Sequence, residues 1–264
     1  MATEDEPLNV KSLAESTALI IGGTAGVGLA SAHQLAQSGV SRITLVGRNQ
    51  ERGNAACEAV AVHGAKVQFI SADAGDADDA VRVADTAAAD MGSIDIMVCS
   101  VSPDVHLNYL HRYPIHDIAS TLNQIALPPL NMTRAVLPVM REQRGGSIIN
   151  VASDAAKVTT PGESVAGAAM AAIVMFTRTV AMEVKRWGVR ANVLTPSLIA
   201  DTRSTERIFQ DPFLTKLFTD VAGHAQLGVA EAADLAAMVV FLASPAARRL
   251  TGQAISVNGG ISAA

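Results

Sequence analysis

The chain of 264 residues has only two cysteines and no excess of positive charge. Cys57 and Cys99 lack the spacing of metal ligands, so we expect two free thiols in a reducing compartment and no metal site. The formal net charge is −5, and the lysines and arginines are scattered along the chain rather than gathered in a stripe. Both observations argue against a nucleic-acid partner.

The chain also has little that would direct it to a membrane or to export. Its first seven residues are acidic and polar, which is not the pattern of a signal peptide. The longest apolar run, residues 165–176, is too short to span a bilayer. We therefore expect a soluble, cytoplasmic protein with no membrane partner. Hydrophobic residues make up 49% of the chain, which is enough to bury a sizeable core.

The clearest motif is a glycine-rich loop near the start of the chain. A short apolar run at residues 18–21 predicts a buried strand, three glycines follow, and an apolar-periodic helix comes next. This order lets the backbone approach a phosphate group. Gly22 would form the tight turn, Gly26 would leave room for a pyrophosphate at the helix N-terminus, and Gly28 would let helix and strand pack closely.

Strand and helix patterns alternate along the rest of the chain. Further strands are expected at residues 42–46, 66–70, 94–99, 147–152, 190–194 and 254–257. Helices are expected at residues 29–37, 50–62, 77–89, 116–141, 164–187 and 230–242. Pro128 and Pro129 should kink or break the helix at 116–141. The alternation predicts βαβ units and a parallel sheet, and the absence of repeats and linkers predicts a single domain over residues 1–264.

Two segments fall outside this pattern. Residues 1–14 are expected to form a loose N-terminal tail. Residues 198–226 have no strong period and are expected to be a loop with short helical pieces that closes over a pocket as a lid on the substrate side. The apolar side chains of this lid suggest a partly apolar small-molecule substrate; they are Phe209, Phe213, Leu217 and Phe218.

The chain resembles the short-chain dehydrogenase/reductase (SDR) family over essentially its full length. The resemblance is carried by the glycine loop, by Asp73, by Asp95 at the start of the fourth strand, and by four segments at residues 146–153, 187–192, 242–253 and 257–260. It implies an α/β fold, a single-domain Rossmann-type doubly wound parallel sheet of about seven strands with helices on both faces. It also implies a set of cofactor-binding residues: Gly22, Thr24, Gly26, Val27, Gly28, Asp73, Ala74 and Ile199.

The end of the second strand indicates which nicotinamide cofactor is preferred. A carboxylate there would accept hydrogen bonds from both ribose hydroxyls of NAD and would repel a 2′-phosphate. Gly47 occupies that place and Arg48 follows, which leaves room for a phosphate and supplies a guanidinium fork to bind it. We therefore predict NADP(H) rather than NAD(H), with Arg48 as the phosphate-binding residue.

The resemblance fails at the residues that carry out the family's reaction. The family uses a tyrosine that transfers a proton, and a lysine four residues later that lowers the pKa of that tyrosine. An ungapped alignment from Ser153 to Trp187 places Ala166 at the tyrosine and Met170 at the lysine. The following serine is replaced by Ala169, and only Ser153 of the catalytic set remains.

An asparagine of the preceding helix is also part of the family pattern. It falls near Ile125, with Asn123 two residues earlier.

Three functional interpretations remain open. In the first, an oxidoreductase acts on a small carbonyl or hydroxyl substrate with a replacement proton donor. The candidates are Tyr109, His106 and His111 in the loop after the fourth strand, and Asp154 and Lys157 after Ser153. In the second, the fold performs non-redox chemistry as an isomerase, lyase, hydratase or cyclase.

In the third, the chain is a non-catalytic subunit that pairs with an active relative. The very apolar helix at 164–187 favours association in all three cases, so a homodimer or homotetramer is expected and a heteromer is the alternative.

Overall fold

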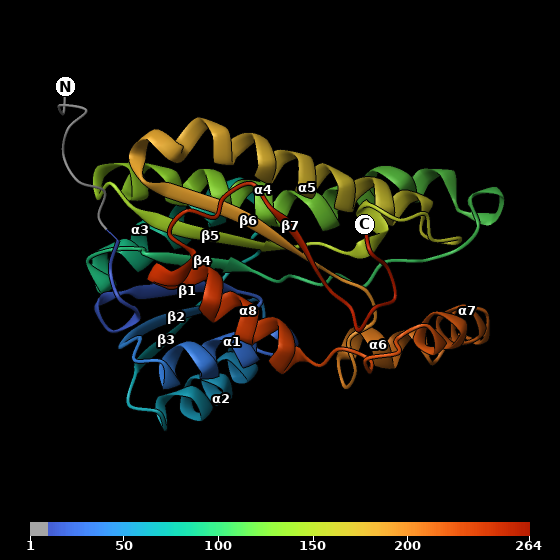
Figure 1. Cartoon of the computed structure of the whole chain (residues 1–264), viewed down its shortest axis with the longest axis horizontal. Coiled ribbons are helices and arrows are strands. Elements are labelled where there is room, and N and C mark those ends of the chain that lie inside the picture. Colours follow the sequence, from blue (N-terminus) through green and yellow to red (C-terminus); the bar gives the residue numbers. More distant parts are fainter. Residues whose placement is uncertain (1–9) are drawn as a thin grey trace.

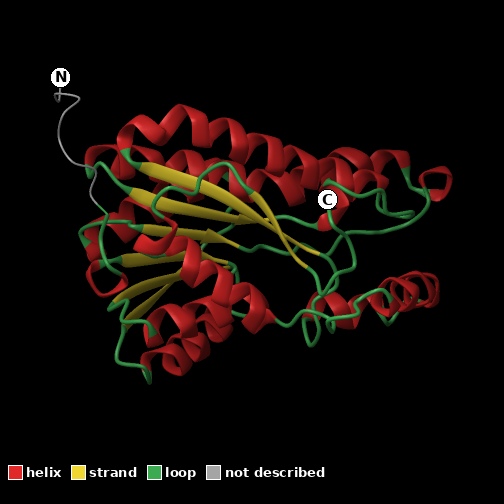
Figure 2. Ribbon diagram, viewed as in Figure 1, coloured by secondary structure: helices red, strands yellow, loops and turns green. Residues whose placement is uncertain are grey.

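The computed structural model describes residues 10–264 and is built around a seven-stranded, all-parallel sheet (Figures 1 and 2). The strand order is β3-β2-β1-β4-β5-β6-β7. The strands are β1 (Thr17–Ile21), β2 (Arg42–Gly47), β3 (Lys66–Ser71), β4 (Ile96–Cys99), β5 (Gly146–Val151), β6 (Val189–Pro196) and β7 (Ala254–Val257). The order reverses between β1 and β4, so the expected doubly wound sheet is confirmed.

Helices cover both faces of this sheet, because side chains along each strand alternate between the two faces. Ala18 and Ile20 of β1 pack toward one helix layer, and Leu19 and Ile21 pack toward the other. The first layer holds α1 (Gly26–Gln37), α2 (Gln50–Ala61) and α8 (Ala232–Ala243). The second holds α3 (Ala77–Met91), α4 (Ile118–Glu142) and α5 (Ser164–Val184). Each fully buried leucine or isoleucine of β1 contributes roughly 1.5–3 kcal/mol to the free energy of folding.

Helix α4 corrects one prediction. It runs without a break from Ile118 to Glu142 although Pro128, Pro129 and Pro138 lie inside it. Each proline removes a backbone hydrogen bond, at a cost of about 3 kcal/mol in an exposed helix. Both rings of the Pro128-Pro129 pair are buried, and this packing offsets the loss.

Helix α5 is continued by a 3-10 turn, Lys185–Trp187. Residues Ser164–Trp187 together are long and apolar enough to cross a membrane. Of an apolar stretch of 18 residues within them, 44% is buried inside the protein. A helix in the core of a soluble protein can have the same length and the same apolar composition. Here the buried side of α5 includes Ala169, Ile173 and Ala181, which pack in the core, while Met175 and Met182 are exposed.

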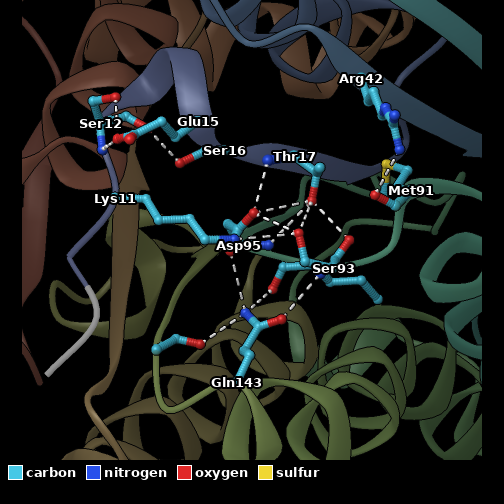
Figure 3. A network of polar contacts seen from close by, with 12 residues as sticks. Lys11, Ser12, Glu15, Ser16, Thr17, Arg42, Met91, Ser93, Asp95 and Gln143 are labelled. Carbon is cyan, nitrogen blue, oxygen red and sulfur yellow. Dashed lines mark hydrogen bonds and ion pairs between the residues drawn. The ribbon is translucent and has the colours of Figure 1, made fainter.

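Figure 3 shows the network of hydrogen bonds that closes the amino-terminal end of the sheet. Asp95, which precedes β4, is its centre. One carboxylate oxygen pairs with Lys11 Nζ at 2.7 Å, and the other accepts from the Thr17 amide at 2.9 Å and the Ser93 hydroxyl at 2.8 Å. Lys11 and the 3-10 helix Leu13–Glu15 anchor residues 10–14, so this part of the expected tail is attached rather than loose. Residues 1–9 of that tail lie outside the described residues.

Segment 198–226 contains two helices, α6 (Arg203–Ile208) and α7 (Pro212–Gly223). In Figure 1 they lie beyond the end of the sheet that faces away from the N-terminus, beside the last part of β6. Leu198, Leu214 and Phe218 form a small buried cluster there. The prediction of short helical pieces is confirmed, and these pieces stand where the carboxyl ends of the strands open.

Candidate functional site

A cavity of about 1330 Å³ lies at the carboxyl ends of the strands. Its lining comes from the glycine loop, the ends of β2, β4, β5 and β6, the middle of α4, the first turns of α5, and segment 198–226. In doubly wound sheets, ligands bind in the crevice outside the carboxyl ends of the strands where the order reverses. The cavity is large enough for a dinucleotide and a small substrate together.

The glycine loop has the geometry that its sequence predicts. Gly22 adopts φ +78°, and a Cβ there would lie 3.0 Å from the Ser100 carbonyl. A Cβ on Gly28 would lie 2.3 Å from the Gly22 oxygen, so only glycine lets α1 approach the strand this closely. Gly26 also has a positive φ, of +51°, but a Cβ there would meet only Thr202, at 3.7 Å. The loop is therefore tight where helix and strand meet and open where a phosphate would lie.

Helix α1 presents its N-terminus to this open space. It begins at Gly26, and its cap residue Ala25 has no side chain that can accept a hydrogen bond from the first-turn amides. Such amides, together with the helix dipole, attract an anion. The residues present therefore fit the pyrophosphate of a dinucleotide, with Thr24 and Val27 also lining the cavity.

Three arginines surround the same end of the cavity. Arg48 follows β2, Arg52 lies in the first turn of α2, and Arg203 begins α6; all three are exposed and line the cavity. Arg52 and Arg203 also share a smaller hollow of about 230 Å³ with Thr24. Sequence reasoning found Arg48 and missed the other two. Arg52 lies four residues after Arg48 in the sequence, whereas nothing local to Arg203 indicates its position.

The other cofactor-binding residues implied by the family resemblance also line the cavity. Asp73 accepts a hydrogen bond from the Gly75 amide at 2.9 Å, and Ala74 is buried beside it. Asn131 of α4 holds this turn through the Gly75 carbonyl at 3.0 Å. Ile199 lies at the opposite wall, where it is bridged to Ala230.

Ser153, Ala166 and Met170 lie together at the other end of the cavity. Ser153 follows β5 and caps a short 3-10 helix, Asp154–Ala156, by accepting from the Ala155 amide at 3.2 Å. Ala166 and Met170 stand on one face of α5, four residues apart. Neither side chain can donate or accept a proton.

Helix α4 contributes Asn123 and Ile125 to the same cavity. Ile125, near which the resemblance places the asparagine, is buried.

Only some of the polar residues in the loop after β4 line the cavity. His106 is in the lining, and its ring lies 5.6 Å from that of Tyr113. Tyr109 and His111 stack on each other with ring centroids 5.9 Å apart, and neither lines the cavity. The geometry does not support Tyr109 as a proton donor, because the loop turns away from the cavity after Leu107.

The polar residues after Ser153 are engaged with the last residues of the chain. Asp154 is buried and accepts hydrogen bonds from Asn258 and from the Ser262 hydroxyl. Lys157 donates to Ser256 Oγ and to the Ala264 oxygen, each at 2.6 Å, and does not line the cavity. Burial lowers the pKa of Lys157, an effect that Asp154 partly opposes. Both residues therefore hold the C-terminal segment in place.

Glu163 lines the cavity and was missed by sequence reasoning. It is the cap residue of α5, three residues before Ala166. Burial raises the pKa of its carboxyl to about 7, and a hydrogen bond with Thr160 opposes that shift. No local pattern in the sequence marks this glutamate, because the shift of its pKa depends on burial in the fold.

Segment 198–226 packs against Leu107 of the loop after β4 and is also joined to that loop by polar contacts. Arg207 of α6 pairs with Asp104 at 3.1 Å, and the Ser102 and Ser204 hydroxyls lie 3.3 Å apart. All four residues line the cavity, so the segment is attached along its rim.

Comparison with known proteins agrees with the fold and the glycine loop. Residues 16–212 match the model of the family described as short chain dehydrogenase. The chain therefore belongs to the short-chain dehydrogenase family, whose members are oxidoreductases that bind nicotinamide cofactors.

Particular relatives are dehydrogenases and reductases. The chain is 31% identical over 248 residues to dehydrogenase/reductase SDR family member 4 of Homo sapiens, over 94% of this chain and 88% of the relative. It is 29% identical over 253 residues to a 3-oxoacyl-acyl-carrier-protein reductase of Synechocystis sp., over 95% of this chain and 98% of that relative. Among solved structures, levodione reductase superposes with a TM-score of 0.87 at 27% identity, over 93% of this chain and 96% of the other.

Proposed function

We propose that this protein is an NADP(H)-dependent oxidoreductase that acts on a small, partly apolar carbonyl or hydroxyl compound with a non-standard set of catalytic residues. The observation that carries the proposal is the intact dinucleotide half of the cavity, from the glycine loop to Asp73. NADPH, when bound, supplies a hydride. The chain would hold its pyrophosphate at the start of α1 and its 2′-phosphate at Arg48, with Arg52 and Arg203 adding positive charge.

The preference for a phosphorylated cofactor rests on charge and space. Gly47 places no carboxylate at the end of β2, and a Cβ there would lie 3.3 Å from Thr24. Guanidinium groups bind phosphate through paired, charge-assisted hydrogen bonds. Three arginines around one end of the cavity therefore favour NADP(H) over NAD(H).

The substrate end supports a departure from the family's usual reaction mechanism. Ala166 and Met170 line the cavity where the resemblance places the tyrosine and lysine, so proton transfer needs another group. The same observation favours a second candidate function, in which the chain performs non-redox chemistry or serves as a non-catalytic subunit beside an active relative. The exposed Met175 and Met182 of α5 would then lie in the contact with a second chain, as they would in a homodimer or homotetramer. A cytoplasmic location stays a prediction from the sequence.

The test begins with cofactor binding and continues with turnover. NADPH fluorescence is measured on titration with the protein, and NADPH absorbance is then followed with ethyl acetoacetate or butane-2,3-dione as carbonyl probes. We expect enhanced fluorescence followed by loss of absorbance. Binding without oxidation of NADPH by either probe would favour the second candidate function, and no binding at all would contradict the proposal.

A further inference from the structure

Glu163 stands where a group could reach the space beside Ala166. Residues spaced by three or four lie on one face of a helix, so Glu163, Ala166 and Met170 line one side of the cavity. A Cβ on Gly167 would lie 2.9 Å from the Ala155 oxygen. The first turn of α5 is therefore pressed against the segment that directly follows Ser153, and both Glu163 and Ser153 line the cavity.

The surroundings of Glu163 favour the neutral acid. Removal from water is the largest influence on its carboxyl and raises its pKa to about 7, so acid and carboxylate are both populated near neutral pH. General acid–base catalysis is most efficient when the pKa of the group lies near the working pH.

Other titratable groups line the same cavity. From the loop after β4 and the segment after β5 they are Asp104, His106 and Asp154; from segment 198–226 they are Arg203, Glu206, Arg207, Asp211 and His224. Asp154 is bound by Asn258 and Ser262, and Asp104 is paired with Arg207. None of these charges is among the causes of the Glu163 shift. The pKa of the Glu163 carboxyl is thus raised by burial rather than by a charged partner.

Resting on the oxidoreductase function proposed above, we infer that Glu163 exchanges the proton with the substrate oxygen. In reduction, the carbonyl carbon accepts the hydride that NADPH supplies when bound, and the C=O π bond breaks. The electron pair left on oxygen takes the proton of the Glu163 carboxyl, giving an alcohol, a glutamate carboxylate and NADP⁺. Water then returns a proton to the carboxylate.

The first measurement needs no substrate. The pKa of Glu163 is higher in the folded protein than in the unfolded chain. Protonated Glu163 therefore stabilises the folded state: this stabilisation is complete below the unfolded pKa and is lost as pH rises through about 7. The melting temperature of the native protein should therefore fall relative to that of Glu163→Gln between pH 5 and pH 8. Glu183→Gln, the same change at an exposed position of α5, should run parallel to the native protein.

The second measurement is the reduction of ethyl acetoacetate with NADPH. Loss of a general acid costs roughly 10²–10⁴ in rate, so Glu163→Gln should lower kcat by that amount without a change in NADPH affinity. In the native protein kcat should fall as pH rises through 7, and Glu183→Gln should behave like the native protein.

The two proposals fail in different ways. Parallel melting curves for native protein and Glu163→Gln, or native-like kcat in Glu163→Gln, would overturn the role of Glu163 and leave the oxidoreductase assignment standing. A native protein that binds NADPH but oxidises it with neither carbonyl probe would overturn the assignment, and the transfer step with it.

Discussion

The two ends of the sheet each hold a carboxyl group that is shielded from water, Asp95 buried and Glu163 half-buried, and the two groups have opposite surroundings. Asp95, at the amino-terminal end, is paired with Lys11 and accepts from Thr17 and Ser93. Glu163, at the carboxyl end, has a hydrogen bond with Thr160 and a raised pKa. A buried carboxylate with a partner for each oxygen holds a fold together, whereas a carboxyl with few partners is available to carry a proton.

The largest expected effect comes from Asp95→Ala. Removing the buried Asp95 leaves the half-buried Lys11 without this partner and also removes the acceptor for Thr17 and Ser93. We expect a loss of about 3 kcal/mol in the free energy of unfolding, measured by urea denaturation. Binding of NADPH by the fraction that remains folded should be unchanged, because Asp95 lies at the other end of the sheet.

Asp90→Ala is the matched control for this change. Asp90 pairs with Lys66 at 3.4 Å on the surface of the protein, where both side chains are exposed to solvent. An exposed pair contributes about 0.2–1 kcal/mol. A similar loss for both variants would show that the Asp95 network is no stronger than a surface contact.

Gly28→Ala should affect both stability and binding. The new Cβ would lie 2.3 Å from the Gly22 oxygen, so α1 must move away from β1. Overpacking of this kind costs about 1–3 kcal/mol, and the displaced helix N-terminus should bind NADPH at least tenfold more weakly. Thermal melting and fluorescence titration would measure the two effects. Native-like affinity would show that the close approach of helix and strand is not needed for binding.

Arg48→Ala should affect binding alone, and by the smallest amount. Arg48 is exposed, so its loss should not change the melting temperature. A charge-assisted hydrogen bond contributes about 1.5–3 kcal/mol, which predicts about a tenfold or larger loss of NADPH affinity with little change for NADH. Arg42→Ala is a control at the other end of β2. Equal losses for NADPH and NADH would contradict the role of Arg48 as phosphate-binding residue.

Local patterns in the sequence predicted most of the fold. Alternating strands and helices gave the parallel sheet, and the glycine spacing gave the tight and open points of the loop at Gly22, Gly26 and Gly28. The break predicted at Pro128 and Pro129 is absent, because local propensity carries no information about the packing around these buried prolines in the continuous helix α4.

Site residues could be predicted from the sequence only where they directly follow a strand that has a clear pattern. The phosphate-binding loop and Ser153 follow directly from their strands. Arg203 reaches the cavity from a segment without a strong pattern, and Tyr109 is two residues past the point where its loop leaves the cavity. The importance of Glu163 depends on burial, which a single glutamate in a sequence does not reveal.

The contacts of segment 198–226 make the entrance to the cavity sensitive to ionic strength. Asp104 is 80% exposed where it meets Arg207, so dissolved ions screen this pair. Another polar contact, between Ser102 and Ser204, is a single hydrogen bond at the surface. Added salt should therefore weaken the polar part of this rim, whereas the buried cluster of Leu198, Leu214 and Phe218 is not screened by ions.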